Sequence, residues 1–145
     1  MNKSVKLQPI AKISQQQERN AARSHGDSIR QVEQQQQQLN ELINYRNQYL
    51  NAFRSAGESG LPASQMQDYR LFLSRLDDAI AQQQQQVMNG QQQCEIKQEK
   101  WMHKRSRSKM VNKVVEKRQL TEHREMEKRE QRELEDQPHK TFTAG

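Results

Sequence analysis

The feature that most constrains the fold is a pair of apolar helical segments separated by one short loop. The segments QLNELINYRNQYLNAF and QMQDYRLFLSRLDDAI flank the loop RSAGESGLPAS, in which Gly57, Gly60 and Pro62 interrupt a helix. Ser64, followed by Gln67, can form a capping box at the start of the second helix. Because a short loop makes neighbouring helices antiparallel, this stretch predicts the tip of a helical hairpin.

Apolar residues recur in alternating steps of three and four on both sides of the loop. Before the loop these steps select Ile29, Val32, Gln36, Leu39, Ile43, Arg46, Leu50 and Phe53. After it they select Met66, Tyr69, Leu73, Leu76, Ile80, Gln83, Val87, Gly90, Cys94, Lys97, Trp101, Lys104, Ser108, Val111 and Val115. Such heptad spacing predicts a coiled coil. The same frame gives His25, Ala22, Glu18 and Gln15 before Ile29, so we expect a weaker seam there.

Apolar residues are too scarce for a thick core. Only 31% of the 145 residues are hydrophobic and 29% are charged, whereas globular domains average about 45–50% apolar residues. Low hydrophobicity can also indicate disorder. The helical spacing, and the abundance of Gln, Glu, Lys and Arg as helix formers, favour long helices instead. The predicted fold is therefore all-α: a long antiparallel two-helix coiled-coil hairpin with an overhanging C-terminal helix.

We expect a single coiled-coil domain over residues 1–145. Its parts are a lead-in at 1–8, a first helix at 9–56, the hairpin loop at 57–63, a second helix at 64–137 and a tail at 138–145. Folding about residue 59 places Pro9 near Lys109, so helix beyond that point would overhang. Asn89–Gly90 could break or kink the second helix, and one helix with a soft point there is the preferred interpretation.

Neither catalysis nor metal binding is expected. The four histidines, His25, His103, His123 and His139, have no partner at metal-ligand spacing, and Cys94 on the seam is explained as a small buried thiol. A two-helix hairpin also offers no concavity that would exclude water from a reaction. We therefore predict a protein that is not an enzyme and needs no cofactor. No run of about 18–20 apolar residues predicts a membrane span, so we expect a cytoplasmic or peripheral protein.

Aromatic residues beside the loop form a candidate docking surface. Tyr45 and Tyr49 share one helix face, which Leu42 extends by a turn. Phe72, Leu76 and Ala79 form a similar stripe on the second helix. Two helices cannot bury this whole set, and a partly exposed apolar and aromatic patch is typical of binding sites. The alternative is a seam that is simply wider near the loop.

The segment KQEKWMHKRSRSKMVNKVVEKR, residues 97–118, is markedly basic in a chain of net charge +6. A solvated helix face, a surface for an acidic protein and a nucleic-acid site are the alternatives. Leucine-zipper DNA readers place their basic region before a zipper, whereas here it follows a hairpin, and Trp101 lies on the seam. Nucleic acid is therefore not the expected partner. Residues 119–136 are acid-rich, and their charge pattern indicates a solvated helix.

Taken together, these segments resemble the FliJ family of bacterial flagellar export proteins. The resemblance rests on QLNELINYRNQYL, the Gly-containing loop, YRLFLSRLDDAIAQQ, the Trp-containing basic helix and the charged C-terminal helix. It implies a non-enzymatic stalk that binds and promotes the hexameric flagellar export ATPase. It also implies contacts with the cytosolic part of the export gate, a membrane protein, and with export chaperones. The protein would then be cytoplasmic and peripheral on the inner membrane at the flagellar base.

The resemblance also implies which residues bind these partners. The positions matching the family's gate-binding surface are Gln38, Leu42, Tyr45, Tyr49, Phe72, Leu76 and Ala79, and position 83 is Gln where relatives can carry His. Acidic loops of the ATPase ring could be met by Lys100, Lys104, Arg105, Lys109 and Lys113. The equivalent stalk of a virulence-type secretion apparatus, and a generic coiled-coil scaffold, remain alternatives.

Overall fold

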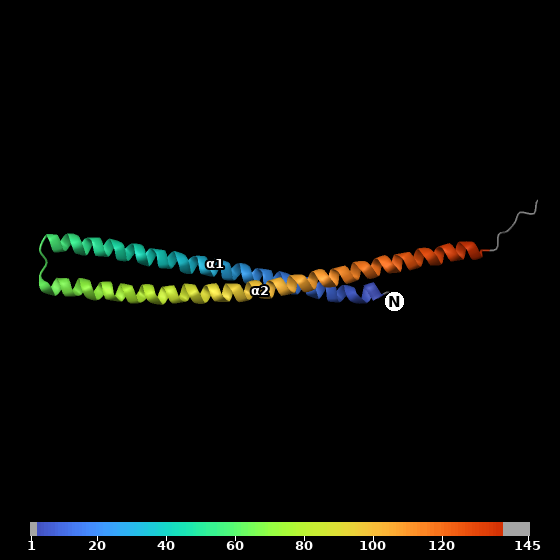
Figure 1. The fold of residues 1–145 in the computed structure, drawn as a ribbon, viewed down its shortest axis with the longest axis horizontal. Coiled ribbons are helices and arrows are strands. Elements are labelled where there is room, and N and C mark those ends of the chain that lie inside the picture. Colours follow the sequence, from blue (N-terminus) through green and yellow to red (C-terminus); the bar gives the residue numbers. More distant parts are fainter. Residues whose placement is uncertain (1–2, 138–145) are drawn as a thin grey trace, which may run out of the picture. The chain divides into compact units, whose positions relative to one another are not determined.

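Residues 3–137, which the computed structural model describes, form two α-helices joined by a short loop (Figure 1). Helix α1 spans Lys3–Glu58 and helix α2 spans Ala63–Asp136. The two helices pack against each other, and residues 3–137 contain no strand, so the all-α hairpin prediction is confirmed. Helix α2 continues without interruption through Asn89 and Gly90. The predicted tail at 138–145 lies outside the described residues, as do the first two residues of the lead-in.

Helix α1 starts earlier than its local sequence signal indicates. It begins at Lys3 instead of Pro9, and Pro9 lies inside it. A proline inside a helix removes one backbone hydrogen bond. The first turns are nevertheless held against α2, because Ser4 is buried and Leu7 is half-buried. Helix α1 also continues past Gly57, and Gly60, with a φ of 86°, makes the turn that only glycine adopts without strain.

The packing contacts divide the chain into two units. Residues Ala21–Trp101 form the hairpin unit, and the described parts of Met1–Asn20 and Met102–Gly145 form the terminal unit. Each unit pairs a stretch of α1 with a stretch of α2. The expectation of one domain over residues 1–145 stays a prediction.

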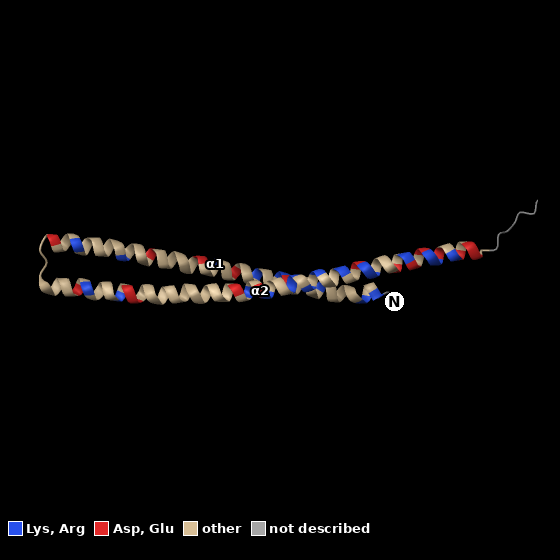
Figure 2. Ribbon diagram, in the orientation of Figure 1, with Lys and Arg blue, Asp and Glu red and all other residues tan. Residues whose placement is uncertain are grey.

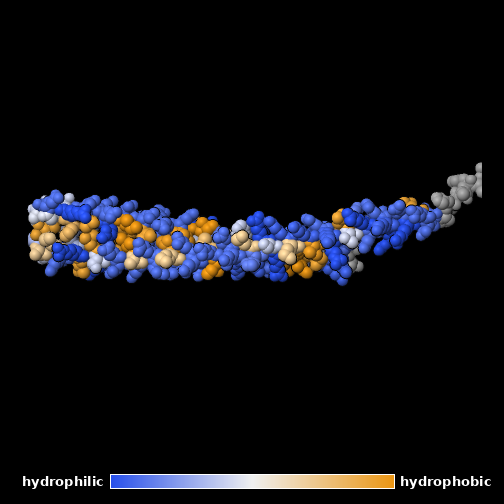
Figure 3. Space-filling model, in the orientation of Figure 1, coloured by the Kyte–Doolittle hydropathy of each residue, from blue (hydrophilic) through white to orange (hydrophobic). Residues whose placement is uncertain are grey.

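Near the loop, the hairpin unit has an apolar seam. Leu39, Leu76 and Val87 are each no more than 7% exposed. Figure 3 shows apolar side chains gathered between the two helices at the loop end. Across the same seam the Arg46 guanidinium lies 2.5 Å from the Asp77 carboxylate. These contacts fix the antiparallel register of this unit.

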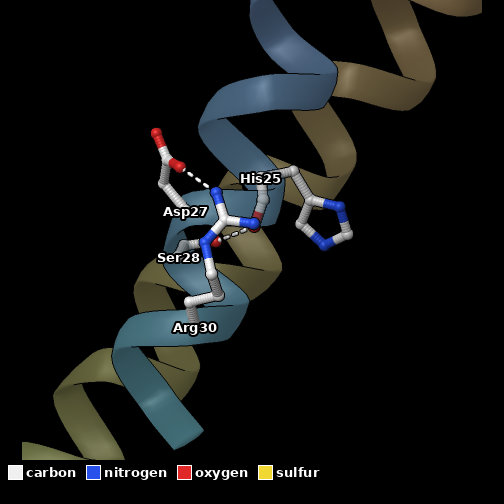
Figure 4. Close-up of polar contacts among 4 residues, drawn as sticks. All are labelled: His25, Asp27, Ser28 and Arg30. Carbon is white, nitrogen blue, oxygen red and sulfur yellow. Dashed lines mark hydrogen bonds and ion pairs between the residues drawn. The ribbon is translucent and has the colours of Figure 1, made fainter. Parts of the chain in front are cut away.

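At the other end of the hairpin unit, ring stacking takes the place of aliphatic packing. The rings of His25 and Trp101 are stacked, with centroids 5.6 Å apart and planes 16° apart. Ser28 is buried one turn further on, and its hydroxyl donates a hydrogen bond of 2.6 Å to the His25 carbonyl (Figure 4). Arg30 forms an ion pair with Asp27 on the exposed face of the same turn (Figure 4). The weak seam expected around His25 is thus closed by stacking and a small side chain.

The terminal unit is held together by small side chains. The buried residues are Ser4, Ala11, Ser14, Ser108 and Val115. Small residues allow two helices to approach closely, which leaves little room between them for larger side chains. The amide of Gln15 donates a hydrogen bond of 3.2 Å to the Asn112 side-chain carbonyl across this seam.

Glu122 of α2 caps the N-terminus of α1. The Ser4 backbone N–H donates to Oε1 of Glu122 at 3.1 Å, and the Ser4 hydroxyl donates to Oε2 at 2.5 Å. The first N–H groups of a helix lack intrahelical partners and carry partial positive charge, which a carboxylate satisfies. The hydroxyl bond from Ser4 is the main reason that the pKa of Glu122 is lowered, and the Ser4 backbone bond and Arg118 act in the same direction.

This cap corrects the expected start of the overhang. Folding about residue 59 placed the end of pairing near Lys109, but contacts between the helices continue to Glu122. The difference arises because α1 begins six residues earlier than expected and the loop is centred further along the chain. From His123 to Gln137 every residue is exposed, and Figure 2 shows dense charge of both signs on this last part of α2. Neither α1 nor α2 contains a stretch long and apolar enough to cross a membrane.

The cap predicts a specific pH dependence of stability. Because folding lowers the pKa of Glu122, its stabilisation is complete above the ordinary value of 4.5 and is lost as the pH falls through the lowered value. We expect Glu122→Gln to lower the melting temperature at neutral pH and to flatten the decline in melting temperature below about pH 4.5. Thermal unfolding followed by circular dichroism measures both effects. The exposed control Glu130→Gln should keep the native profile, and a native profile for Glu122→Gln would contradict the cap.

Candidate docking site

Five aromatic rings from the two helices form a continuous cluster in the hairpin unit, next to the loop. The ring centroid of Tyr49 lies 4.5 Å from that of Phe72 and 5.1 Å from that of Tyr69. Tyr45 meets Phe72 edge-on at 6.3 Å, and Phe53 lies 5.3 Å from Tyr69. Rings contributed by both helices therefore alternate through the cluster.

Helical spacing accounts for the alternation. Tyr45, Tyr49 and Phe53 follow one another in steps of four on α1, while Tyr69 and Phe72 are three residues apart on α2. Residues three or four apart lie on one helix face, so each helix presents its rings to the other. An aromatic pair contributes about 0.5–1.5 kcal/mol beyond its buried area. The cluster therefore stabilises the hairpin unit as well as shaping its surface.

Exposure rises across this part of the molecule from the seam to one side. Leu76 is buried in the seam, at 7% exposure. Tyr49 and Phe72 are half-buried, and Tyr45 is 50% exposed with an edge contact to Phe72. A half-exposed ring that packs edge-on against a half-buried one resembles the aromatic anchors found in binding hot spots. Tyr45 is thus the outermost element of the cluster.

The sequence-predicted gate-binding residues divide into four groups in the structure. Tyr45, Tyr49 and Phe72 are brought together by direct ring contacts. Leu42 and Ala79 are half-buried, whereas Leu76 belongs to the seam. Gln38 is exposed, and its side-chain oxygen accepts a 3.4 Å hydrogen bond from Gln83.

Two members of the cluster were not among the predicted site residues. Phe53 and Tyr69 fall on the heptad frame and were assigned to the core, yet both are half-buried and touch the other rings. Their spacing was the signal that could have found them. Tyr69 lies three residues before Phe72, and Phe53 lies four residues after Tyr49.

The electrostatics of the cluster favour a neutral surface. Burial raises the pKa of Tyr49, and Tyr69, Tyr45 and Asp68 raise it further. A tyrosine phenol is already protonated at neutral pH, and the raised pKa of Tyr49 acts in the same direction, so its hydroxyl can donate a hydrogen bond. The site combines apolar area with phenolic donors, which suits an apolar peptide segment that offers carbonyl acceptors.

A second candidate surface consists of the predicted basic residues. Lys100 belongs to the hairpin unit, whereas Lys104, Arg105, Lys109 and Lys113 belong to the terminal unit. Arg105, Lys109 and Lys113 follow one another in steps of four and are all exposed, so they share one face of α2. Lys104 is half-buried and lies off that face. The structure thus brings three of the five together.

No metal site accompanies these surfaces among residues 3–137: no group of three His, Cys, Asp or Glu side chains is placed to hold an ion. Cys94 is a free, half-buried thiol. The two candidate surfaces consist of aromatic and basic side chains.

Comparison with known proteins gives one family. The family model described as "Flagellar FliJ protein" matches residues 2–136. The chain is 30% identical to the flagellar FliJ protein of Escherichia coli (strain K12) over 101 residues, which cover 70% of this chain and 69% of the relative. It is 26% identical to the flagellar FliJ protein of Salmonella typhi, with the same coverage. No solved structure matches the chain significantly.

The geometry of the cluster predicts unequal roles for its two α1 tyrosines. Tyr49→Ala removes ring contacts with both Phe72 and Tyr69, so we expect it to lower the free energy of unfolding by about 1–3 kcal/mol. Tyr45→Ala removes one edge contact of a half-exposed ring and should cost less than about 1 kcal/mol. Urea unfolding followed by circular dichroism gives both values. Equal losses would show that Tyr45 is as structural as Tyr49.

Proposed function

Since the chain belongs to the FliJ family of flagellar proteins, we propose that it is a non-enzymatic stalk of the flagellar protein export apparatus. In this role it binds the hexameric export ATPase, contacts the export gate and interacts with export chaperones. The observation that carries the proposal is that the family match covers both candidate surfaces, the aromatic cluster and the basic face. The flagellar names of both relatives favour this apparatus over a virulence-type one.

The ATPase contact is assigned to the terminal unit. Arg105, Lys109 and Lys113 share an exposed face that suits acidic loops lining a ring. A protein that binds the assembled ring better than the separate subunits stabilises the ring by linkage. Hydrolysis per ATPase chain then rises without any catalytic group from the stalk.

The gate contact is assigned to the aromatic cluster. Tyr45 touches the gate directly, and its ring is supported by Phe72, which packs in turn against Tyr49. Leu76 supports the site from the seam instead of making contact itself, because it is buried. The protein would then work at the cytoplasmic face of the inner membrane, attached through the gate.

An ATPase titration tests the proposal. At a fixed, low concentration of the cognate export ATPase, the full-length protein should produce a saturable rise in hydrolysis. Lys109→Glu with Lys113→Glu should weaken this effect at least about tenfold, because the charge reversal opposes acidic loops. Arg54→Glu with Arg70→Glu, a matched double reversal at exposed residues near the loop, should preserve it. A flat response from helical protein would overturn the stalk function.

Gate binding is tested separately. Tyr45→Ala should reduce affinity for the cytosolic part of the gate at least about tenfold, which corresponds to about 1.4 kcal/mol. Leu71→Ala is the matched control, because Leu71 is 54% exposed near the same loop but lies outside the cluster. Isothermal titration calorimetry compares the two variants. Equal affinities would leave the aromatic cluster with a structural role and point to a generic scaffold.

A further inference from the structure

The hairpin unit contains a hollow that both of its helices line. Its volume is about 390 Å³, and its lining includes Ile29, Val32 and Glu33 of α1 and Gln91, Cys94 and Glu95 of α2. Val32 and Cys94 are half-buried and Ile29 is 39% exposed, whereas Glu33 and Glu95 are exposed. The hollow therefore combines apolar side chains with two carboxylates, and we call it the acidic hollow.

The acidic hollow lies in a stretch of the chain that lacks positive charge. Residues 31–45 of α1 and 76–96 of α2 contain no basic residue. Lys97 follows directly, but it is half-buried at a seam position. In a chain of net charge +6, these two segments carry only acidic residues, namely Glu33, Glu41, Asp77, Asp78 and Glu95.

The two carboxylates of the hollow are not neutralised by the hairpin itself. Among residues 3–137, neither Glu33 nor Glu95 forms an ion pair. The basic residue closest in sequence on α1, Arg30, is paired with Asp27 instead. An occupant of the acidic hollow would thus meet apolar area and negative charge together.

The outer face of the first turns of α1 has the complementary chemistry. Alternating steps of three and four place five exposed residues on this face: Lys3, Lys6, Ile10, Ile13 and Gln17. Ile10 is 46% exposed and Ile13 is 58% exposed, and residues 3–17 contain no acidic residue. We call Lys6, Ile10 and Ile13 the basic ridge.

We propose that the acidic hollow of one copy of this protein binds the basic ridge of a second copy. A convex row of side chains on one helix packs into the concave space between two others, as ridges pack into grooves. Ile10 and Ile13 of the ridge cover Ile29 and its apolar neighbours, and Lys6 meets the carboxylates of the hollow. This self-association goes beyond the proposed stalk function and uses neither the aromatic cluster nor the basic face of α2.

Two other occupants satisfy only half of these features. An anionic membrane would attract Lys6 but would be repelled by Glu33 and Glu95. A basic helix of another protein would fill the hollow but would leave Ile10 and Ile13 exposed. Contact between two copies covers both apolar surfaces and pairs both sets of charges.

The form of the association follows from the difference between the two surfaces. Because a ridge meets a hollow, the contact is heterologous, and each bound copy still offers one free ridge and one free hollow. Sedimentation velocity of the full-length protein should therefore show a sedimentation coefficient that rises steadily with concentration. Added salt should weaken the association, because the charges involved are exposed.

A charge exchange between two variants tests the pairing directly. Fluorescence-detected sedimentation, with a label at the C-terminus of one copy, gives the affinity. Lys6→Glu, and separately Glu33→Lys with Glu95→Lys, should each weaken self-association at least about tenfold. Mixing these two variants brings reversed charges together and should restore at least about tenfold of the affinity. Ile13→Gln should also weaken association, because it removes apolar contact area.

Matched controls carry the same charge changes away from the two surfaces. Arg19→Glu, at an exposed position off the ridge, and Glu41→Lys with Asp78→Lys, at exposed positions outside the hollow, should keep the native affinity. Circular dichroism establishes that every variant is folded.

Several outcomes would overturn the proposal. They are a protein that stays monomeric at all concentrations, an association that the ridge and hollow variants leave unchanged, and a mixture of the two variants that fails to associate. Binding of phosphatidylglycerol vesicles through Lys6 without self-association would assign the ridge to membranes instead. The hollow variant, Glu33→Lys with Glu95→Lys, should stimulate the ATPase normally, so failure here is distinguishable from failure of the stalk function.

Discussion

In each unit, a narrow seam between one stretch of α1 and one stretch of α2 has to bury everything that the described residues bury. Among residues 3–137, only a few apolar side chains are buried: Ala11, Leu39, Leu76, Val87 and Val115. Within this described part of the chain, no third layer covers the outer faces of either helix. Every apolar residue of the described helices that does not fit the seam is therefore at least partly exposed, and partly exposed apolar residues that cluster are candidates for binding surfaces.

The seam changes character along each helix, and each change leaves a different surface. In the hairpin unit the rings of Tyr49 and Phe72 are too large for two helices to enclose, so the cluster spreads to one side and exposes Tyr45. In the terminal unit the buried seam residues are small, among them Ser14 and Ser108, and helical spacing places Ile10 and Val114 beside the seam, where they are 46% and 48% exposed. The two units thus leave different partly exposed surfaces, one aromatic and one aliphatic.

Periodicity predicted the features that depend on local spacing. The heptad frame placed Leu39, Leu76, Val87, Ser108 and Val115 on the seam, and all five are buried. The grouping of Tyr45, Tyr49 and Phe72 also followed from helical spacing, although their binding role stays a prediction. The extent of pairing could not be predicted. It depends on the contact of Ser4 with Glu122, 118 residues away, which no local pattern encodes and which outweighs the proline signal at Pro9.

Polar contacts add to the apolar seam in setting the register of the hairpin unit. Its middle is rich in glutamine, so several registers would bury similar apolar area. In the observed register the side-chain amide of Gln83 donates a hydrogen bond of 3.0 Å to the backbone carbonyl of Gln35. The side-chain amide of Gln35 lies where a Cβ atom at position 90 would be, so Gly90 leaves room for it. The side-chain oxygen of Gln35 is buried there without a partner, which costs about 1–3 kcal/mol. In a shifted register the hydrogen bond between Gln83 and Gln35 would be lost, and Gln35 would no longer lie opposite Gly90. Gln35 therefore lowers the stability of the hairpin unit but favours one register over the others.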